Sequence, residues 1–273
     1  MSQSGSLMQR AMPPESLSRL EHARSTSGDE LKSLVHAAEE DILLAVLDNP
    51  NFEEPHAVLL LTRLDLTPRL LNAIAMKESW VSSEAVRLRL AAHPRTPKRI
   101  ALAAVRRLFL FDLLRLSLLP SAPADIKRVA EGLIVARVPH LPVGEKLTLA
   151  RRGPSRVAGA LLAEGHPQAI KLALGNGFLN ESQVLKVLAA PGVPERVVAA
   201  VAQHPKWSSQ YNVRVALVRN PCTPLQSVLG FLPHLAGSDL KEISKIEELP
   251  SLLRKYILQD LARRQRSAEK DSQ

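Results

Sequence analysis

The chain has 273 residues and a net charge of +9 at pH 7, and it is 45% hydrophobic but only 3% aromatic. Its apolar mass is therefore aliphatic, which suits closely packed helices. The single cysteine, Cys222, excludes an internal disulfide and any zinc or iron–sulfur site built from cysteines. The apolar run 108–120 contains Asp112 and Arg115 and is too short to span a bilayer, and no charged-then-apolar signal opens the chain. We therefore expect a cytoplasmic protein without membrane insertion.

The first segment, residues 1–28, is rich in serine, and we expect it to be largely disordered with at most a short helix. A helix is expected from about Asp29 to Leu47, because apolar residues recur there at helical spacing. That stripe consists of Leu31, Val35, Ala38, Ile42 and Ala45. Residues 29–248 form the predicted helical body. Residues 249–273 are expected to add a terminal helix that caps the array and a charged tail.

Pairs of prolines at a spacing of three interrupt this body at residues 93–97 and 220–224. A residue before proline is pushed out of the α-helical region, so Pro94 and Pro221 are predicted to end a helix. A threonine followed by proline can start the next helix, through the threonine hydroxyl as cap and the proline at the first position. This predicts caps at Thr96 and Thr223 with Pro97 and Pro224 behind them, and a third example at Thr67 and Pro68.

The helix after the second corner carries apolar residues at positions i, i+3, i+4 and i+7. These are Leu225, Val228, Leu229 and Leu232, and we expect all four to face the core. No stretch of the chain shows sustained apolar–polar alternation flanked by hairpin turns. The predicted fold class is therefore all-α.

The two corners belong to a repeated stretch, because residues 80–97 align with residues 207–224 at an offset of 127. The two tryptophans of the chain, Trp80 and Trp207, occupy the same place in the two copies. Weaker proline pairs occur at 120/123, 139/142 and 191/194. Together they indicate a period of roughly 25 to 30 residues with one short helix pair in each unit, which is typical of an α-solenoid.

The stretches VRLRLAAHPRTP (86–97) and VRVALVRNPCTP (213–224) resemble the leucine-rich repeat variant family, whose units contain a Val-Arg pair followed by an Asn-Pro-x-Thr-Pro-like corner. The broader similarity is to HEAT-like solenoids. The resemblance covers much of residues 45–235 and implies an α-solenoid of degenerate repeats. One member type of this family carries an iron–sulfur cluster in a cysteine-rich region, and that feature is not expected in a chain with one cysteine.

A basic run between residues 87 and 107 contains no acid, and its members are the candidate partner-binding residues. They are Arg87, Arg89, Arg95, Lys98, Arg99, Arg106 and Arg107. The last four share one half of a predicted amphipathic helix. Such a face can follow a nucleic-acid backbone or an acidic protein segment, or it can simply be solvated. Because residues 1–54 have ten acids and four bases, we also expect this acidic region to lie near Arg99 and Arg106.

The tryptophans allow two interpretations, packing between adjacent helices or stacking on nucleic-acid bases. Their matched repeat positions favour packing. Acidic pairs such as Glu39-Glu40 are neighbours in sequence and point apart on a helix, and no two histidines have zinc-protease spacing. We accordingly expect no catalytic residue, no metal and no cofactor.

Three functions remain compatible with these features. The preferred one is a non-enzymatic scaffold that binds a protein or peptide in a groove of the solenoid. The second is a nucleic-acid-binding solenoid that uses the basic face. The third is an enzyme resembling the HEAT-like alkylpurine DNA glycosylases, which the low aromatic content disfavours. Neither the identity of the partner nor the oligomeric state follows from the sequence.

Overall fold

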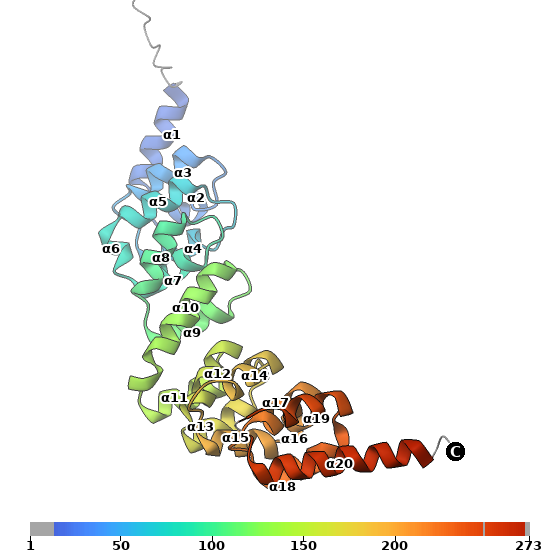
Figure 1. Cartoon of the computed structure of the whole chain (residues 1–273). Helices are drawn as coiled ribbons and strands as arrows, with labels where there is room; N and C mark the ends of the chain where they lie inside the picture. Colours follow the sequence, from blue (N-terminus) through green and yellow to red (C-terminus); the bar gives the residue numbers. More distant parts are fainter. Residues whose placement is uncertain (1–13, 248, 271–273) are drawn as a thin grey trace, which may run out of the picture. The chain divides into compact units, whose positions relative to one another are not determined.

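The computed structural model describes residues 14–247 and 249–270, and within them it contains only α-helices, short 3₁₀ helices and connecting turns (Figure 1). The all-α prediction is confirmed for this part of the chain. The chain divides into two compact units, one ending at Ala130 and the other beginning at Glu131. The division falls within one helix, α10 (Ala124–Arg137).

Unit 1 contains nine helices before α10 among its described residues. They are α1 (Pro14–Ser25), α2 (Gly28–Leu34), α3 (Glu40–Leu47), α4 (Glu54–Leu60), α5 (Pro68–Met76), α6 (Glu78–Val81), α7 (Glu84–Ala92), α8 (Lys98–Arg106) and α9 (Leu110–Leu118). α1 packs on α3 and α3 on α5, whereas α4 packs on α7 and α7 on α9. Alternate helices therefore form two series within this unit.

Unit 2 repeats this arrangement after the 3₁₀ turn η1 (Val138–His140). Its helices are α11 (Val143–Arg152), α12 (Ser155–Glu164), α13 (Pro167–Leu174), α14 (Glu181–Leu188), α15 (Glu195–Gln203), α16 (Pro205–Ser208), α17 (Tyr211–Arg219), α18 (Leu225–Phe231), η2 (Leu232–His234), α19 (Gly237–Ser244) and α20 (Ser251–Lys270). One series runs α11–α13–α15 and the other α12–α14–α17–α19.

The internal repeat extends far beyond the aligned stretches 80–97 and 207–224. The offset between those stretches also relates whole helices, because α3, α5, α6 and α7 match α13, α15, α16 and α17 at both ends. The first residues of α2, α4, α8, α9 and α10 match those of α12, α14, α18, α19 and α20 at the same offset. Within the described residues, the two units are thus copies of one helical pattern, in which a residue of unit 1 has an equivalent in unit 2.

The proline corners lie where the sequence places them. α7 ends at Ala92 and α8 begins at Lys98, and α17 ends at Arg219 and α18 begins at Leu225. At the weaker corners, helices begin immediately after Pro123, Pro142 and Pro194. The second proline of each pair is therefore the last residue before a helix.

The predicted caps at Thr96 and Thr223 are wrong, and Pro97 and Pro224 stand at the N-cap rather than inside the helix. Each threonine comes one residue before the N-cap, so its hydroxyl does not accept a hydrogen bond from the free N–H groups of the first turn. The Thr223 hydroxyl instead donates to the carbonyl of Leu217, 2.5 Å away, at the end of the preceding helix. Thr67 is the exception and accepts from the N–H of Leu70, as predicted.

The helix predicted from Asp29 to Leu47 is in fact two helices, α2 and α3, separated by residues 35–39. The guanidinium of Arg63 donates to the carbonyls of Val35 and Ala37, at 2.8 and 2.7 Å, and so stabilises the turn between them. The segment expected to be disordered also differs. Residues 1–13 lie outside the described residues, but α1 forms in the rest of that segment and buries Ala23 against α3.

Buried asparagines join successive helix pairs at equivalent places in both units. The Asn49 amide donates to the carbonyls of Ala23 and Thr26, at 2.9 and 2.8 Å. The Asn176 amide makes the equivalent bonds to the carbonyls of Ala150 and Gly153, at 2.8 and 2.9 Å. Carbonyls at a helix C-terminus have no partner within the helix, so each asparagine satisfies two of them from the next repeat.

Candidate partner-binding surfaces

Both tryptophans belong to the core, which confirms the packing interpretation. Trp207 is only 1% exposed, and its Nε1–H donates to the carbonyl of Leu174 at 2.9 Å. Trp80 is also buried and its ring packs against Phe52, with centroids 5.1 Å apart. Neither ring is accessible for stacking on a base.

The seven basic candidates divide into two groups. The Arg87 side chain is only 12% exposed, and its guanidinium donates to the carbonyl of Ser82 at 3.0 Å. Its equivalent, Arg214, donates to the carbonyl of Ser208 at 2.5 Å. The arginine of the Val-Arg pair therefore closes the turn that precedes its own helix, in both units, and is occupied within the fold.

The other six candidates, from Arg89 to Arg107, are exposed. Lys98 forms an ion pair with Asp125 at 3.0 Å, and this hydrogen-bonded contact lowers the pKa of Asp125. Arg95 donates to the carbonyl of Asp65. Four candidates, Arg89, Arg99, Arg106 and Arg107, form neither an ion pair nor a side-chain hydrogen bond within the described ranges. α8 buries Ala101, Ala104 and Val105, so the predicted amphipathic orientation of this helix is confirmed.

The acidic region of unit 1 does not pair with the basic face of α8. Asp41 lies 3.7 Å from Arg69 and Asp48 lies 2.8 Å from Lys77, so these carboxylates reach bases of the next helix in their series or just beyond it. Glu39 pairs with Arg19 of α1 at 3.0 Å. These three carboxylates thus pair with bases of adjacent helices and not with α8.

The predicted apolar stripe of α18 is only half correct. Val228 and Leu232 are buried, but Leu225 and Leu229 are 37% and 38% exposed. α18 is short and its core-facing side is narrow, so two of the four stripe residues fall on its open side.

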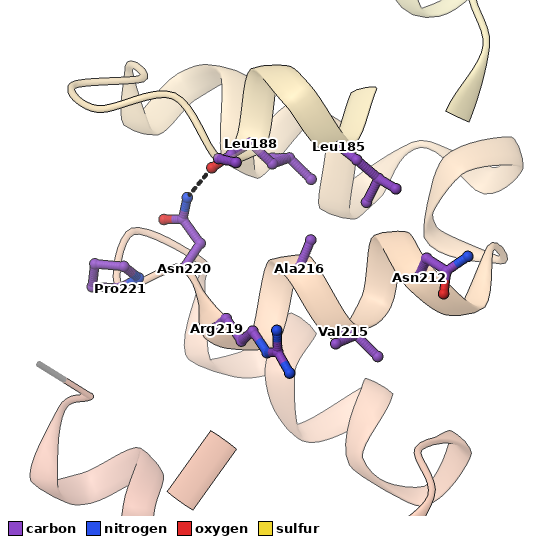
Figure 2. A pocket seen from close by; sticks show the side chains of 9 residues that line it. Leu185, Leu188, Asn212, Val215, Ala216, Arg219, Asn220 and Pro221 are labelled. Atoms are coloured by element: carbon purple, nitrogen blue, oxygen red, sulfur yellow. Dashed lines mark hydrogen bonds between the residues drawn. The ribbon is translucent and has the colours of Figure 1, made fainter. Parts of the chain in front are cut away.

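A groove lies between α14 and α17 of unit 2, with a volume of about 560 Å³. Figure 2 shows Leu185 and Leu188 of α14 opposite Ala216 of α17, with Arg219 beside them. The Asn220 amide closes one end by donating to the carbonyl of Leu188 at 3.1 Å. We call this surface the α14–α17 groove.

Unit 1 has a groove of only about 150 Å³ that shares part of this lining, and it lies between α7, the turn after α4 and the end of α9. Seven lining positions are equivalent in the two grooves. They pair as Leu61/Leu188, Thr62/Ala189, Leu88/Val215, Arg89/Ala216, Ala92/Arg219, His93/Asn220 and Pro94/Pro221. The larger Arg89 stands where unit 2 has Ala216, and the smaller Ala92 stands where unit 2 has Arg219.

His93 takes the structural place of Asn220 at the end of the smaller groove. It is buried, and its Nε2 lies 2.7 Å from the carbonyl oxygen of Arg63 while its Nδ1 accepts from the N–H of Arg95. The first bond requires a proton on Nε2 and the second a free Nδ1, which defines the neutral tautomer. Burial accordingly lowers the pKa of His93.

The sequence did not indicate the paired grooves, because the helices that form their walls are not consecutive in the chain. The signal available was the repeat itself. Once the offset of 127 is known to relate the whole units, any surface feature of one unit can be sought at the equivalent residues of the other.

Comparison with protein-family models, with curated proteins and with solved structures gives no match for this chain. Membership of the repeat family that the two corner motifs suggest therefore stays a prediction. In the described part of the chain, no helix has both the length and the hydrophobicity needed to cross a bilayer. Nor do three or more His, Cys, Asp or Glu side chains gather there as a metal site would require.

Proposed function

We propose that the chain is a non-enzymatic helical-repeat scaffold, each unit of which is a short α-solenoid, and that it binds a peptide segment of a protein partner in the α14–α17 groove. The observation that carries the proposal is the groove itself. It is open, it has apolar walls, and it is larger than the groove of unit 1 that shares part of its lining. Apolar grooves between packed helices are the usual sites for peptide segments on such scaffolds.

The chemistry of the groove specifies the peptide. Leu185, Val215 and Ala216 offer an apolar surface for one or two aliphatic side chains. Arg219 is exposed at the edge and makes no ion pair in the described part of the chain, so it favours a carboxylate next to those side chains.

The test introduces into the groove the larger residue that unit 1 has at the equivalent position. Peptides are selected against the full chain from a random library, and their affinity is measured by calorimetry. Ala216→Arg, which introduces the residue found at the equivalent position 89, should lower that affinity by about tenfold or more because it fills the groove.

The matched control is Gln226→Arg, which adds the same charge on the exposed side of α18, outside the groove. It should leave the affinity within about twofold of wild type. If the library yields no binder, or if both variants lose affinity equally, the peptide-binding proposal fails.

A second candidate function is nucleic-acid binding through Arg99, Arg106 and Arg107, whose exposure without ion pairs in the described ranges is the specific observation in its favour. A mobility-shift titration with random duplex and single-stranded DNA at two salt concentrations tests it. Binding that weakens steeply with salt and is lost in the triple alanine variant supports this function. Binding that persists in the triple variant excludes this face as its site.

A further inference from the structure

Helices α3 and α5 of unit 1 and their equivalents in unit 2, α13 and α15, differ in their ion pairs. In unit 1, Arg69 of α5 faces Asp41 of α3 at 3.7 Å, and Lys77 faces Asp48 at 2.8 Å. Two carboxylates thus reach from the α3 segment to the α5 segment. In unit 1 the bases of this surface have anionic partners within the chain.

Unit 2 keeps one of these bases and loses both carboxylates. Arg196 is equivalent to Arg69, but Gln168 stands in the place of Asp41 and Gly175 in the place of Asp48. Lys171 adds a further positive charge at the place of Leu44. Neither Lys171 nor Arg196 forms an ion pair within the described ranges.

These two bases line a groove between α13 and α15, with a volume of about 690 Å³. Its apolar surface includes Ile170, Leu174 and Ala200, and no acidic side chain lines it. Glu195 is adjacent to Arg196 in sequence but does not line the groove. The α13–α15 groove therefore combines an aliphatic surface with two positive charges that the fold does not neutralise.

The Arg196 side chain lies beside the backbone turn that ends α12. Gly165 ends α12 with a positive φ of 83°, and a Cβ added there would lie 3.4 Å from Nε of Arg196. The guanidinium consequently packs over the turn that leads into α13, whose first turn contains Gln168. Because position 168 is equivalent to position 41, we expect a carboxylate at position 168 to pair with Arg196 as Asp41 pairs with Arg69.

We propose that the α13–α15 groove binds an acidic, aliphatic peptide segment of a partner, whose carboxylates pair with Arg196, as Asp41 pairs with Arg69 in unit 1, and with Lys171. The anion opposite the equivalent arginine is a carboxylate, which specifies the ligand chemistry. The aliphatic surface suits leucine-like side chains, and no aromatic side chain that could stack on a nucleic-acid base lines the groove apart from His204. This surface is separate from the α14–α17 groove and does not depend on it.

The probe is a fluorescein-labelled peptide of alternating glutamate and leucine, four of each, blocked at both ends, and its binding to the full chain is followed by fluorescence anisotropy. We expect binding at low salt that weakens as salt rises, because exposed charges are screened. Gln168→Asp should weaken it by about tenfold or more, since the new carboxylate pairs with Arg196 as Asp41 pairs with Arg69. Arg196→Gln should have a similar effect.

Gln226→Asp is the matched control, because it makes the same chemical change at an exposed position of α18 outside the groove. It should leave peptide affinity within about twofold of wild type. Gln168→Asp also places an acid in the first turn of α13, where it is favourable, so denaturant midpoints should show that the variant is folded.

Three outcomes overturn the proposal. The first is no binding of the peptide at low salt. The second is an equal loss of affinity in Gln168→Asp and Gln226→Asp, which would indicate general attraction to a basic chain. The third is tighter binding of a short oligothymidine strand that Gln168→Asp abolishes, which would assign the groove to nucleic acid. None of these results depends on whether Ala216→Arg blocks the other groove.

Discussion

The two units share one helical pattern but differ in their surfaces. Trp80 and Trp207, and likewise Asn49 and Asn176, recur at equivalent places and are buried, and the proline corners recur at equivalent places between helices. The surfaces between helices differ in charge and volume. The recurring buried residues therefore hold each unit together. The differing residues lie on the surfaces that we propose for partner binding.

Charge pairing gives the clearest difference. Unit 1 has Asp41 and Asp48 opposite bases of the α5 segment, whereas unit 2 has Gln168 and Gly175 in those places. A solvated ion pair adds little to stability, typically below about 1 kcal/mol. Its loss in unit 2 therefore costs the fold little, while it leaves Arg196 available to an external anion.

The largest expected effect concerns the tryptophans. Trp207→Ala and Trp80→Ala should each lower the free energy of unfolding by about 3–5 kcal/mol, because each ring is buried and leaves a cavity. Chemical denaturation of the full chain, followed by circular dichroism, measures both. A change below about 1 kcal/mol in either variant would show that the two positions are not equivalent in packing.

The tryptophan comparison can be sharpened with phenylalanine. Trp207→Phe also removes the hydrogen bond from Nε1–H to the Leu174 carbonyl, whereas Trp80 packs through its ring against Phe52. Trp207→Phe should therefore lower the free energy of unfolding by about 1–2 kcal/mol more than Trp80→Phe does. Equal costs at the two positions would mean that the hydrogen bond contributes nothing measurable.

The apolar stripe of α18 provides the next comparison. Leu232→Ala should destabilise unit 2 by about 2–5 kcal/mol, because Leu232 is buried. Leu229→Ala should cost less than about 1 kcal/mol, because its side chain is 38% exposed. Denaturant midpoints in the reverse order would place Leu229 in the core, as its spacing in the sequence predicts.

Much of the fold could be predicted from local sequence signals. Proline fixes backbone geometry at its own position and the one before it, so the corners at 93–97 and 220–224 could be placed from sequence. The break between α2 and α3 could not, because no proline or glycine marks it. It is stabilised by the guanidinium of Arg63, which follows α4 in the chain. The exact burial of Leu229 also depends on neighbours that sequence spacing does not give.

The candidate surfaces were less predictable than the fold. Exposure of Arg99 and Arg106 follows from helical periodicity and was expected. The hydrogen bond from the Arg87 guanidinium to the Ser82 carbonyl could not be predicted, because it depends on the turn before α7. Grooves between helices that are distant in the chain require the tertiary arrangement, and the equivalent residues often differ in identity, as Arg89 and Ala216 do.

The buried asparagines should give similar effects in the two units. Asn49→Ala and Asn176→Ala each remove two hydrogen bonds to carbonyl oxygens, at a cost of about 2–4 kcal/mol, and in the first variant the Thr26 carbonyl still accepts from the Asn51 amide. Thermal or chemical unfolding of the two variants measures the cost. Loss of stability at one position only would contradict the equivalence of the two junctions.

His93 and Asn220 make a comparison that depends on pH. Burial lowers the pKa of His93, so the folded chain binds this proton less readily than the unfolded chain. Stability should thus be complete above about pH 7 and decline as pH falls through about 6.5, the ordinary value for histidine, toward the lower folded value. Asp65 and Arg95 are the charged groups near this ring, and Arg95 acts in the same direction as burial.

His93→Asn should flatten that decline, since it introduces the residue of unit 2, which also donates to a carbonyl. Free energies of unfolding at about pH 7.5 and about pH 5.5 measure the slope. His204, whose pKa burial and Lys206 also lower, should leave a residual decline in the variant. An unchanged slope in His93→Asn would assign all of the pH dependence to other groups.

The smallest expected effect comes from a comparison of two arginines of the basic run. Arg106→Ala should change the free energy of unfolding by less than about 0.5 kcal/mol, because the side chain is exposed and its place in unit 2 is taken by Pro233. Arg87→Ala should cost about 1–2 kcal/mol, because a guanidinium bonded to the Ser82 carbonyl is lost, and Arg214→Ala should match it. Arg87, whose bond to a turn carbonyl recurs at Arg214, is thus expected to act within the fold, whereas the exposed Arg106 is available to act outside it. If Arg106→Ala destabilised the chain as much as Arg87→Ala, the exposed side of α8 would contribute to the fold and would not be a free surface for a partner.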